Sequence, residues 1–494
     1  MKKSFLYIAA SLLLLTGCNL DINENPNYPS SSDVTADLIF PSVENAIADV
    51  VGDQMFNYAG FFAQYFEQKP SANQYNDLAE LNINESSNLF DRCYRLLYAG
   101  ALQDVKEIMS RDISEGDAFI CTVMRAYAYQ LLVDNLDQCP YTEALQGSSN
   151  NMPAWDAGKD VYVGVLAEMD AAEAALTDGT KTITLTDPML NKDIDAWIVF
   201  ANQLRLRMYM RLYDSGDNSY QDKAIAVAKK LAASGFDDVA WDVYSNAEGQ
   251  YNPWYDTYFN LTNNHVGASP LIDYMNSMND PRVGYAFYTT ANDESVYEGQ
   301  IPGSKTLLPN WLGVTSSQVS NYVSHVNYEV MKSAPIYLMT ASETYFLLAE
   351  VAQRFGASVG ITASDAYEEG VAADPKWSST SDIMAFLGGT GAWSNASDKL
   401  DLIYRQKWVA LFMVDHMEGW TEARRTDVPE LTSLTGKQVF DNEDGYTPGD
   451  FIIPVVNYSG GKLAKRVPYP ADARSLNSNT PATKLISDPV FWDK

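Results

Sequence analysis

Histidine and cysteine are scarce in this chain, with 3 His and 4 Cys among 494 residues. None of the histidines belongs to H-E-x-x-H, and no C-x-x-C pair occurs, so no familiar zinc or redox motif is present. His416 lies in a predicted core helix, where we expect a structural imidazole. The scarcity argues against a zinc enzyme or a thiol oxidoreductase.

Motifs of nucleophilic, phosphate-binding and calcium-binding proteins are missing as well. G-x-S-x-G does not occur, and residues 388–391 lack the lysine of a phosphate loop. Residues 441–445 resemble a calcium loop, but Phe440 would occupy its first ligand position, so a turn is expected. Calcium held at another spacing stays open, and 64 carboxylates neither support nor exclude a glycosidase pair. We predict no enzyme, no cofactor and no metal site.

Basic residues are few, 34 against 64 acidic ones, which gives a net charge of −30. Without Lys2 and Lys3, which lie in the predicted signal peptide, the charge becomes 32 − 64 = −32. Phosphates would be repelled by such a surface, so nucleic acid is excluded as a partner. A neutral ligand or a protein partner is favoured.

The three cysteines beyond the N-terminal region leave two alternatives open. One disulfide can form outside the cytoplasm, for example between Cys121 and Cys139. Alternatively, Cys93, Cys121 and Cys139 are buried free thiols. A chain of this length does not need a disulfide to stabilise its core.

The chain has no apolar run long enough to span a membrane. The run from Phe5 to Leu15, broken by Ser11, has about eleven residues, whereas a spanning helix needs ~20. It follows two lysines and ends in Leu-Thr-Gly-Cys at 15–18, which resembles the lipobox of bacterial lipoproteins. We predict that residues 1–17 are a lipoprotein signal peptide and that Cys18 is acylated at its sulfur. Residues 18–36, which are polar and contain two prolines, then form a lipidated tether.

Beyond Asp37 the dominant signal is helical periodicity. Apolar side chains recur at three- and four-residue spacing in five early segments: 89–109, 117–136, 162–176, 195–213 and 220–233. Short links join such segments into pairs, as in tetratricopeptide units, and 342–355 with 364–373 is the clearest pair. We predict a mostly α fold with a tetratricopeptide-like scaffold of helical pairs. Residues 37–494 are expected to form a single domain.

One long stretch, residues 237–335, has no sustained period. It is rich in Asn, Tyr, Trp, Pro and Gly, and a structureless span of this length inside a compact body is usually functional. We predict that it forms long irregular ligand-binding loops. A second irregular region begins at Thr426.

Several phrases together resemble the SusD/RagB family of outer-membrane nutrient-binding lipoproteins, and they follow the lipobox in the family's order. They are residues 116–145, the helix 195–214, S-E-x-x-F-x-x-A-E at 342–350, Gln-Lys-Trp at 406–408 with Glu-Gly-Trp-x-x-x-Arg-Arg at 418–425, and Arg-Val-Pro-Tyr-Pro at 466–470. The resemblance implies a SusD-like α-helical domain with loops that bear the ligand site. It also implies a SusC-like TonB-dependent outer-membrane transporter as partner, oligosaccharides as the usual ligands, no catalysis, and a lipid-anchored, surface-exposed location.

The matched residues have structural explanations. Arg424, Arg425, Glu343, Glu350 and Glu418 are candidates for ion pairs between packed helices, because the planar guanidinium matches a carboxylate. Three tryptophans on helical stripes are expected in the core: Trp197, Trp408 and Trp420.

Recognition of a sugar requires flat aromatic faces together with amides and carboxylates. The richest local supply is Trp254, Tyr255 and Tyr258, followed by Asn310 with Trp311. A further candidate set near the N-terminus contains Tyr65 and Tyr75. We predict that ligand contacts come from among these residues.

Two other readings of the same architecture stay open. The protein could capture peptides or another non-sugar nutrient. It could also be a transporter lid with no ligand site of its own.

Overall fold

The computed structural model describes residues 34–177 and 179–493. The predicted signal peptide, Cys18 and nearly all of the predicted tether lie outside the described residues. Within these two ranges, no helix combines the length and the apolar character needed to cross a lipid bilayer.

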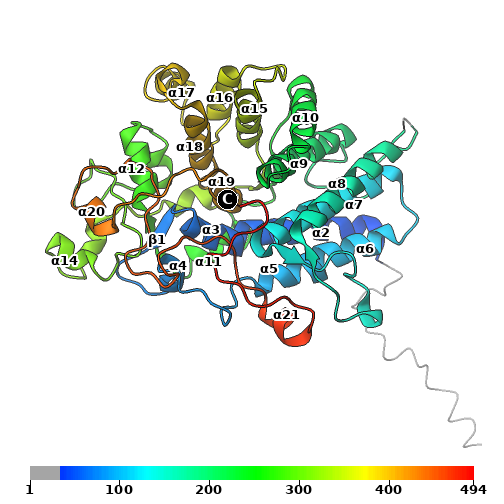
Figure 1. Ribbon diagram of the computed structural model, residues 1–494, viewed down its shortest axis with the longest axis horizontal. Coiled ribbons are helices and arrows are strands. Elements are labelled where there is room, and N and C mark those ends of the chain that lie inside the picture. The colour runs from blue at the N-terminus through cyan, green and yellow to red at the C-terminus, as the bar shows by residue number, and fades with distance from the viewer. Residues whose placement is uncertain (1–33, 178, 494) are drawn as a thin grey trace, which may run out of the picture.

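Helices dominate the described residues and strands are few, as the sequence predicts (Figure 1). In the N-terminal half the helices are α2 (Ala36–Val50), α3 (Phe56–Phe62), α4 (Asn76–Ala79), α5 (Asp91–Arg95), α6 (Gln103–Met109), α7 (Glu115–Leu136), α8 (Gly158–Ala175), α9 (Ile194–Asp214) and α10 (Tyr220–Ser234). In the C-terminal half they are α11 (Pro253–Tyr258), α12 (Ser269–Ser277), α13 (Val283–Ala286), α14 (Leu308–Leu312), α15 (Ala341–Phe355), α16 (Ala363–Ala372), α17 (Thr380–Leu387), α18 (Lys399–Leu411), α19 (His416–Thr426), α20 (Gly436–Phe440) and α21 (Ala471–Leu476).

The long helices pack as pairs, which confirms the predicted scaffold. The pairs are α7 with α8, α9 with α10, α15 with α16, and α18 with α19. In Figure 1 they follow one another in an arc from the right-hand side of the molecule over its top, while α12, α14 and α20 lie on the left. The scaffold therefore occupies one side, and shorter elements occupy the other.

Helix ends follow the capping rules. Ser114 and Asp117 form a reciprocal capping box at the start of α7, and the Thr340 hydroxyl accepts a hydrogen bond from the backbone N–H of Glu343 at the start of α15. α15 stops at Gly356, which has a left-handed φ of 58°. These local signals explain why the helix boundaries agree closely with the sequence pattern.

A glycine allows the close approach of α15 and α16. A Cβ atom at Gly370 would lie 3.1 Å from the ring of Phe346, and that ring also packs against Tyr367. The backbone of α16 can therefore rest on an aromatic face of α15.

The strands are short and form two-stranded antiparallel ribbons. They are β1 (Phe66–Gln68) with β5 (His265–Gly267), β2 (Gln138–Cys139) with β3 (Asp156–Ala157), and β4 (Val239–Trp241) with β6 (Ile336–Met339). The first ribbon ties the N-terminal region to the predicted loop-rich stretch. That stretch contains the short helices α11 to α14 but no long helix.

Buried ion pairs join the helices of the scaffold, as predicted for four of the five charged candidates. Arg207 of α9 lies 2.6 Å from Glu343 of α15. Arg425 of α19 lies 2.6 Å from Glu350 of α15, and Glu418 pairs with Arg211. Removing one partner of such a pair leaves an uncompensated charge in the interior.

For Arg424, the fifth charged candidate, the prediction of an ion pair is wrong. It makes no ion pair among the described residues but donates to the backbone carbonyls of Asp134 at 3.0 Å and Lys465 at 2.6 Å. Its guanidinium lies 3.7 Å from the ring centroid of Trp420. Burial lowers the pKa of Arg424 to about 10. Arg424 therefore fastens the C-terminal segment to the helices.

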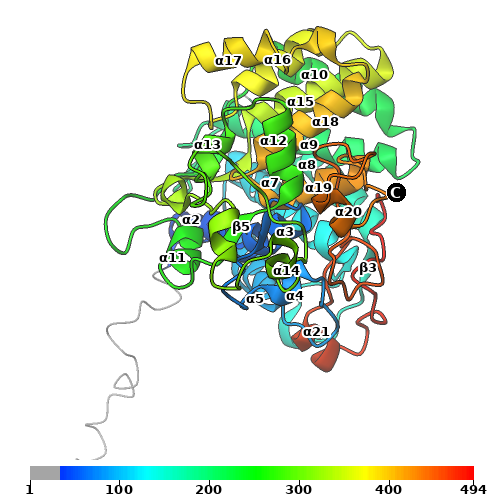
Figure 2. The same cartoon turned by 90° about the vertical axis from the view of Figure 1, so that its left-hand side faces the viewer.

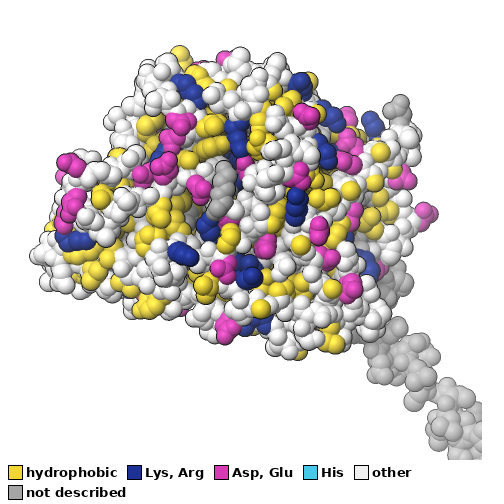
Figure 3. All heavy atoms as spheres, viewed as in Figure 1, with side chains coloured by type: hydrophobic (Ala, Val, Ile, Leu, Met, Phe, Trp, Pro, Cys, Tyr) yellow, Lys and Arg dark blue, Asp and Glu magenta, His cyan; other side chains and the backbone are white. Residues whose placement is uncertain are grey.

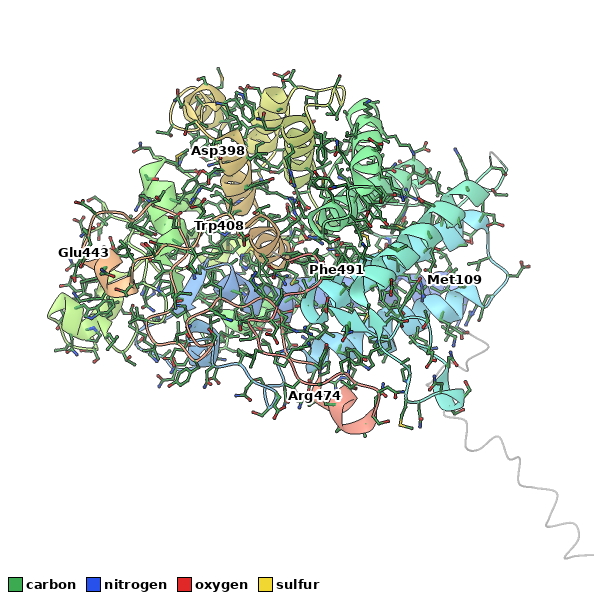
Figure 4. All side chains as sticks on the ribbon, viewed as in Figure 1. Met109, Asp398, Trp408, Glu443, Arg474 and Phe491 are labelled. Carbon is green, nitrogen blue, oxygen red and sulfur yellow. The ribbon has the colours of Figure 1, made fainter. Side chains whose placement is uncertain are left out.

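The three tryptophans predicted for the core are buried, and so are the three cysteines. Trp197, Trp408 and Trp420 are at most 1% exposed, and Figure 4 shows Trp408 inside the molecule on α18. The cysteines are buried free thiols, so the structure selects that alternative over a disulfide: Cys93, Cys121 and Cys139.

Candidate functional site

Three predicted ligand residues lie on the short helix α11 and face the interior. Trp254 is 0% exposed, and its ring stacks between Phe66 and Tyr328 at centroid distances of 5.6 and 5.0 Å. Tyr255 and Tyr258 are also buried. The expected open loop is thus a helix that turns its aromatic face inward, and ligand contact by these three residues stays a prediction.

The N-terminal candidates lie in the same interior. Tyr65 is 0% exposed and donates a hydrogen bond to the Trp408 carbonyl at 2.6 Å. The ring of Tyr75 stacks on His265 at a centroid distance of 4.6 Å. Their aromatic faces are occupied by neighbouring side chains, so ligand contact by these two residues likewise remains untested.

A local signal in the sequence distinguishes this helix from a loop. Asn252 caps α11 by accepting a hydrogen bond from the backbone N–H of Trp254 at 2.9 Å, and Pro253 occupies the first turn. Asn-Pro therefore starts a helix here, and the i, i+4 spacing of Trp254 and Tyr258 places both on one face.

The remaining two candidates lie at the surface on α14. Asn310 is exposed, and Trp311 is half-buried against Phe440 of α20 at a centroid distance of 5.1 Å. The ammonium group of Lys437 lies 5.6 Å from the Trp311 ring centroid. Of the predicted aromatic residues, Trp311 is half-buried, whereas the other five are buried.

A cavity of about 660 Å³ opens beside these residues. Its walls come from α12, the segment 290–301, α14, residues 322–323 and α20 with the turn after it. Figure 2 turns this face toward the viewer, with α12, α14 and α20 around it. In Figure 3, acidic and apolar side chains lie side by side at the left edge, the region of α14 and α20. The volume is within the usual range for small-molecule sites.

The lining combines aromatic, amide and acidic side chains. Its aromatic members are Phe440, Tyr322 and Tyr446. Its amides and hydroxyls are Ser269, Asn276, Thr290, Asn292 and Asn442, and its acids are Asp273, Asp293 and Glu298. Glu443, just beyond the lining, lies at the outer edge of the molecule after α20 (Figure 4).

Asp273 of α12 is the most perturbed acid of the cavity. Burial, and then the negative charge of Glu298, raise its pKa to about 7, against the opposing effect of a hydrogen bond from Tyr446. The pKa of Asp293 is lowered by hydrogen bonds from Ser295. The cavity therefore contains one carboxyl group poised near neutrality beside others at its rim.

These groups support binding. Aromatic faces can stack on the apolar face of a sugar ring, while the amides, hydroxyls and carboxylates can hydrogen-bond its hydroxyl groups. Across the described residues, no group of three or more His, Cys, Asp or Glu side chains is arranged to hold a metal ion.

Sequence reasoning missed most of this cavity. Asp273 and Glu298 lie in the predicted loop-rich stretch, but Phe440 and Tyr446 come from a segment more than 130 residues further along the chain. No local sequence motif predicts that these residues line one cavity, because the tertiary packing of α12, α14 and α20 brings them together. Tyr446 lies in the irregular region that begins at Thr426, where the sequence has no helical period to place it.

The family becomes clear from sequence comparison. Residues 26–449 match the profile of the SusD-like family described as "Starch-binding associating with outer membrane". The chain belongs to this SusD-like family. The resemblance drawn from the sequence motifs is therefore confirmed, and no protein with a curated description is a significant match to the chain.

Solved structures share the fold over nearly the whole chain. A chitin-binding SusD homologue from Flavobacterium johnsoniae superposes with a TM-score of 0.72 and 21% identity, covering 93% of this SusD-like chain and 98% of its own. A SusD homologue from Bacteroides uniformis gives 0.68 and 20%, covering 93% and 100%. One from Bacteroides fragilis gives 0.71 and 17%, covering 93% and 99%. At these identities the likeness establishes the fold.

Proposed function

We propose that this SusD-like protein binds oligosaccharides in the cavity between α12, α14 and α20. The observation that carries the proposal is the lining of that cavity, which places Phe440 and two tyrosines among amides and carboxylates. The family is described as starch-binding, and the Flavobacterium relative as chitin-binding. Both descriptions support a glycan as the ligand class.

The physics of such a site favours weak and reversible capture. Each sugar hydroxyl exchanges hydrogen bonds with water for hydrogen bonds with the protein, so the net gain per contact is small. Stacking adds about 1 kcal/mol per aromatic contact. A dissociation constant of roughly 10⁻³–10⁻⁵ M is expected per site, which suits a protein that must release its ligand.

The proposal includes a lipid anchor at Cys18 and delivery to a SusC-like TonB-dependent transporter in the outer membrane. The lipobox-like sequence at 15–18 and the outer-membrane association of the family support these two steps. Replacing Cys18 with Ala should release the protein from the membrane fraction. Retention of the Cys18→Ala variant in that fraction would contradict the anchor.

The first test is a screen of residues 19–494 against glycan arrays and peptide pools, followed by calorimetry on the best ligand. Phe440→Ala should weaken binding about fivefold or more because it removes a stacking face. Asn292→Ala, an exposed change in the same lining, should weaken it less. Tyr458→Ala is the matched control, since Tyr458 is 63% exposed and lies outside the cavity lining.

Each outcome selects one reading. Glycan binding that Phe440→Ala weakens and Tyr458→Ala does not supports the proposal. Binding of peptides alone would move the protein to the capture of another nutrient. No binding at all, together with co-purification of the transporter, would leave a lid without its own ligand site.

A further inference from the structure

The cavity is lined by charge of one sign. Asp273, Asp293 and Glu298 contribute carboxylates, and no lysine or arginine is among the lining residues. A random surface of this chain would still present one basic residue for about every two acidic ones, given 34 and 64 of each. The lining is therefore more acidic than the chain as a whole.

Three basic residues outside the cavity lining have partners of their own. Lys437 on α20 pairs with Asp441, and Arg405 pairs with Asp450 at 2.7 Å. Lys305 donates to Asn76 at 2.9 Å. Among the described residues, none of these three cations pairs with Asp273, Asp293 or Glu298, so a ligand would meet the cavity acids without a basic partner beside them.

A second observation is independent of these acids. Ser269, at the start of α12, lines the cavity, is 2% exposed and has no hydrogen-bond partner for its Oγ. An unsatisfied buried hydroxyl costs free energy unless a ligand or water completes it. Gly299 packs against it so closely that a Cβ there would lie 2.3 Å from the Ser269 Cα. The cavity wall at this point is thus tightly packed and carries an unpartnered hydroxyl group.

Resting on the proposed function, we propose that the cavity selects its glycan by charge. It takes saccharides that carry a protonated amine, as in unacetylated amino sugars, and rejects uronates and sulfated sugars. The ammonium group lies against the carboxylates of Asp273 and Glu298, and the sugar ring stacks on Phe440.

The proton balance of this step is simple. Near neutral pH, Asp273 is partly protonated because burial and Glu298 raise its pKa to about 7. When the ammonium group binds, the carboxyl proton of Asp273 leaves to the buffer and the resulting carboxylate pairs with the cation. Asp293 and Glu298 stand at the rim, and Tyr446 and Tyr322 are the remaining titratable groups of the lining.

The test compares four hexasaccharides by calorimetry: a fully deacetylated glucosamine hexamer, its N-acetylated form, cellohexaose and an oligogalacturonate. The first three share one linkage and differ at the 2-substituent. We expect the amine hexamer to bind about tenfold more tightly than cellohexaose, the worth of one partly buried ion pair, and the uronate not to bind. Raising the salt concentration should shrink the amine preference.

Isosteric variants make the test specific. Asp273→Asn and Glu298→Gln should each reduce the ratio of amine-hexamer affinity to cellohexaose affinity severalfold. Calorimetry of the parent in two buffers of different ionisation enthalpy should detect proton release at pH 6 that Asp273→Asn abolishes. Asp222→Asn, an exposed change on α10, is the charge-matched control and should behave as the parent.

The failures of the two proposals are distinguishable. If any neutral or anionic glycan binds and the amine hexamer binds no more tightly, the charge selection is overturned and glycan capture stands. If the preference persists in Asp273→Asn and Glu298→Gln, the selecting group lies elsewhere and the inference is also overturned. If no saccharide binds, glycan capture itself fails.

Discussion

Glu44 of α2 offers a stringent test of the interior. It is 0% exposed, and its carboxyl group faces that of Asp187. Asp187 accepts hydrogen bonds from the backbone N–H of Leu190 at 2.9 Å and from Trp197 Nε1 at 2.7 Å. Near neutral pH Glu44 carries the proton of this pair, because its own pKa is raised far above its usual value. Burial, followed by Asp187, raises the pKa of Glu44 from 4.5 to about 10.

The magnitude follows from linkage. The folded pKa lies above the unfolded one, so folding takes up a proton between these two values. The contribution of Glu44 to the free energy of unfolding is therefore greatest below pH 4.5. It falls by about 1.4 kcal/mol for each pH unit toward 10. Between pH 6 and 8, Glu44 should remove about 3 kcal/mol from the free energy of unfolding. Glu44→Gln keeps the shape, retains a donor toward Asp187 and cancels this loss.

The assay is urea unfolding of residues 19–494 at pH 6 and pH 8, followed by tryptophan fluorescence and far-ultraviolet circular dichroism. Other groups titrate in this range, among them Asp415, whose pKa burial raises to about 7. They are common to parent and variant, so the difference between the two proteins isolates Glu44. Glu294→Gln makes the same chemical change at an exposed position and is the matched control.

The expected result is that Glu44→Gln is more stable than the parent at pH 8 and that its advantage is about 3 kcal/mol larger there than at pH 6. Glu294→Gln should follow the parent at both values. Equal pH dependence of Glu44→Gln and the parent would refute the buried, protonated carboxyl pair.

Two further changes test the interior and the scaffold. Trp254→Ala should destabilise the protein by about 3–5 kcal/mol through the cavity it leaves in the aromatic cluster. If the variant is as stable as the parent but binds the ligand more weakly, Trp254 contacts the ligand and is not a core residue. Arg425→Gln should cost about 3 kcal/mol in urea unfolding, because Glu350 and Glu422 would lose their shared buried cation and keep Arg354 at 2.8 Å and Lys407 at 2.7 Å, respectively, as their closest cations. A loss below about 1 kcal/mol would indicate that the pairs are solvated.

The scaffold was predictable because its signals are local. A stripe of apolar residues at helical spacing, a cap such as Ser114 and a stop such as Gly356 are all read within one turn of the helix they define. The buried Arg425 pair was accessible in the same way, through residues carried by helical motifs. Arg424 was not, since its partners are backbone carbonyls of distant segments.

The site was harder to predict because the composition of a segment does not determine whether its aromatic side chains face the interior or the solvent. Trp254 and Trp311 both follow an Asn or Pro signal in Tyr- and Asn-rich stretches, yet one is fully buried and the other half-buried. What separates them is the partner surface. Phe66 and Tyr328 cover both faces of Trp254, whereas Trp311 has Phe440 on one side. Those contacts come from segments far apart in the sequence.

The most direct test of glycan capture is a crystal structure of residues 19–494 with the best oligosaccharide from the array. We expect a sugar ring between α12, α14 and α20, stacked on Phe440 and hydrogen-bonded to Asp273 or its neighbours in the lining. A sugar ordered at another surface, with this cavity empty, would contradict it.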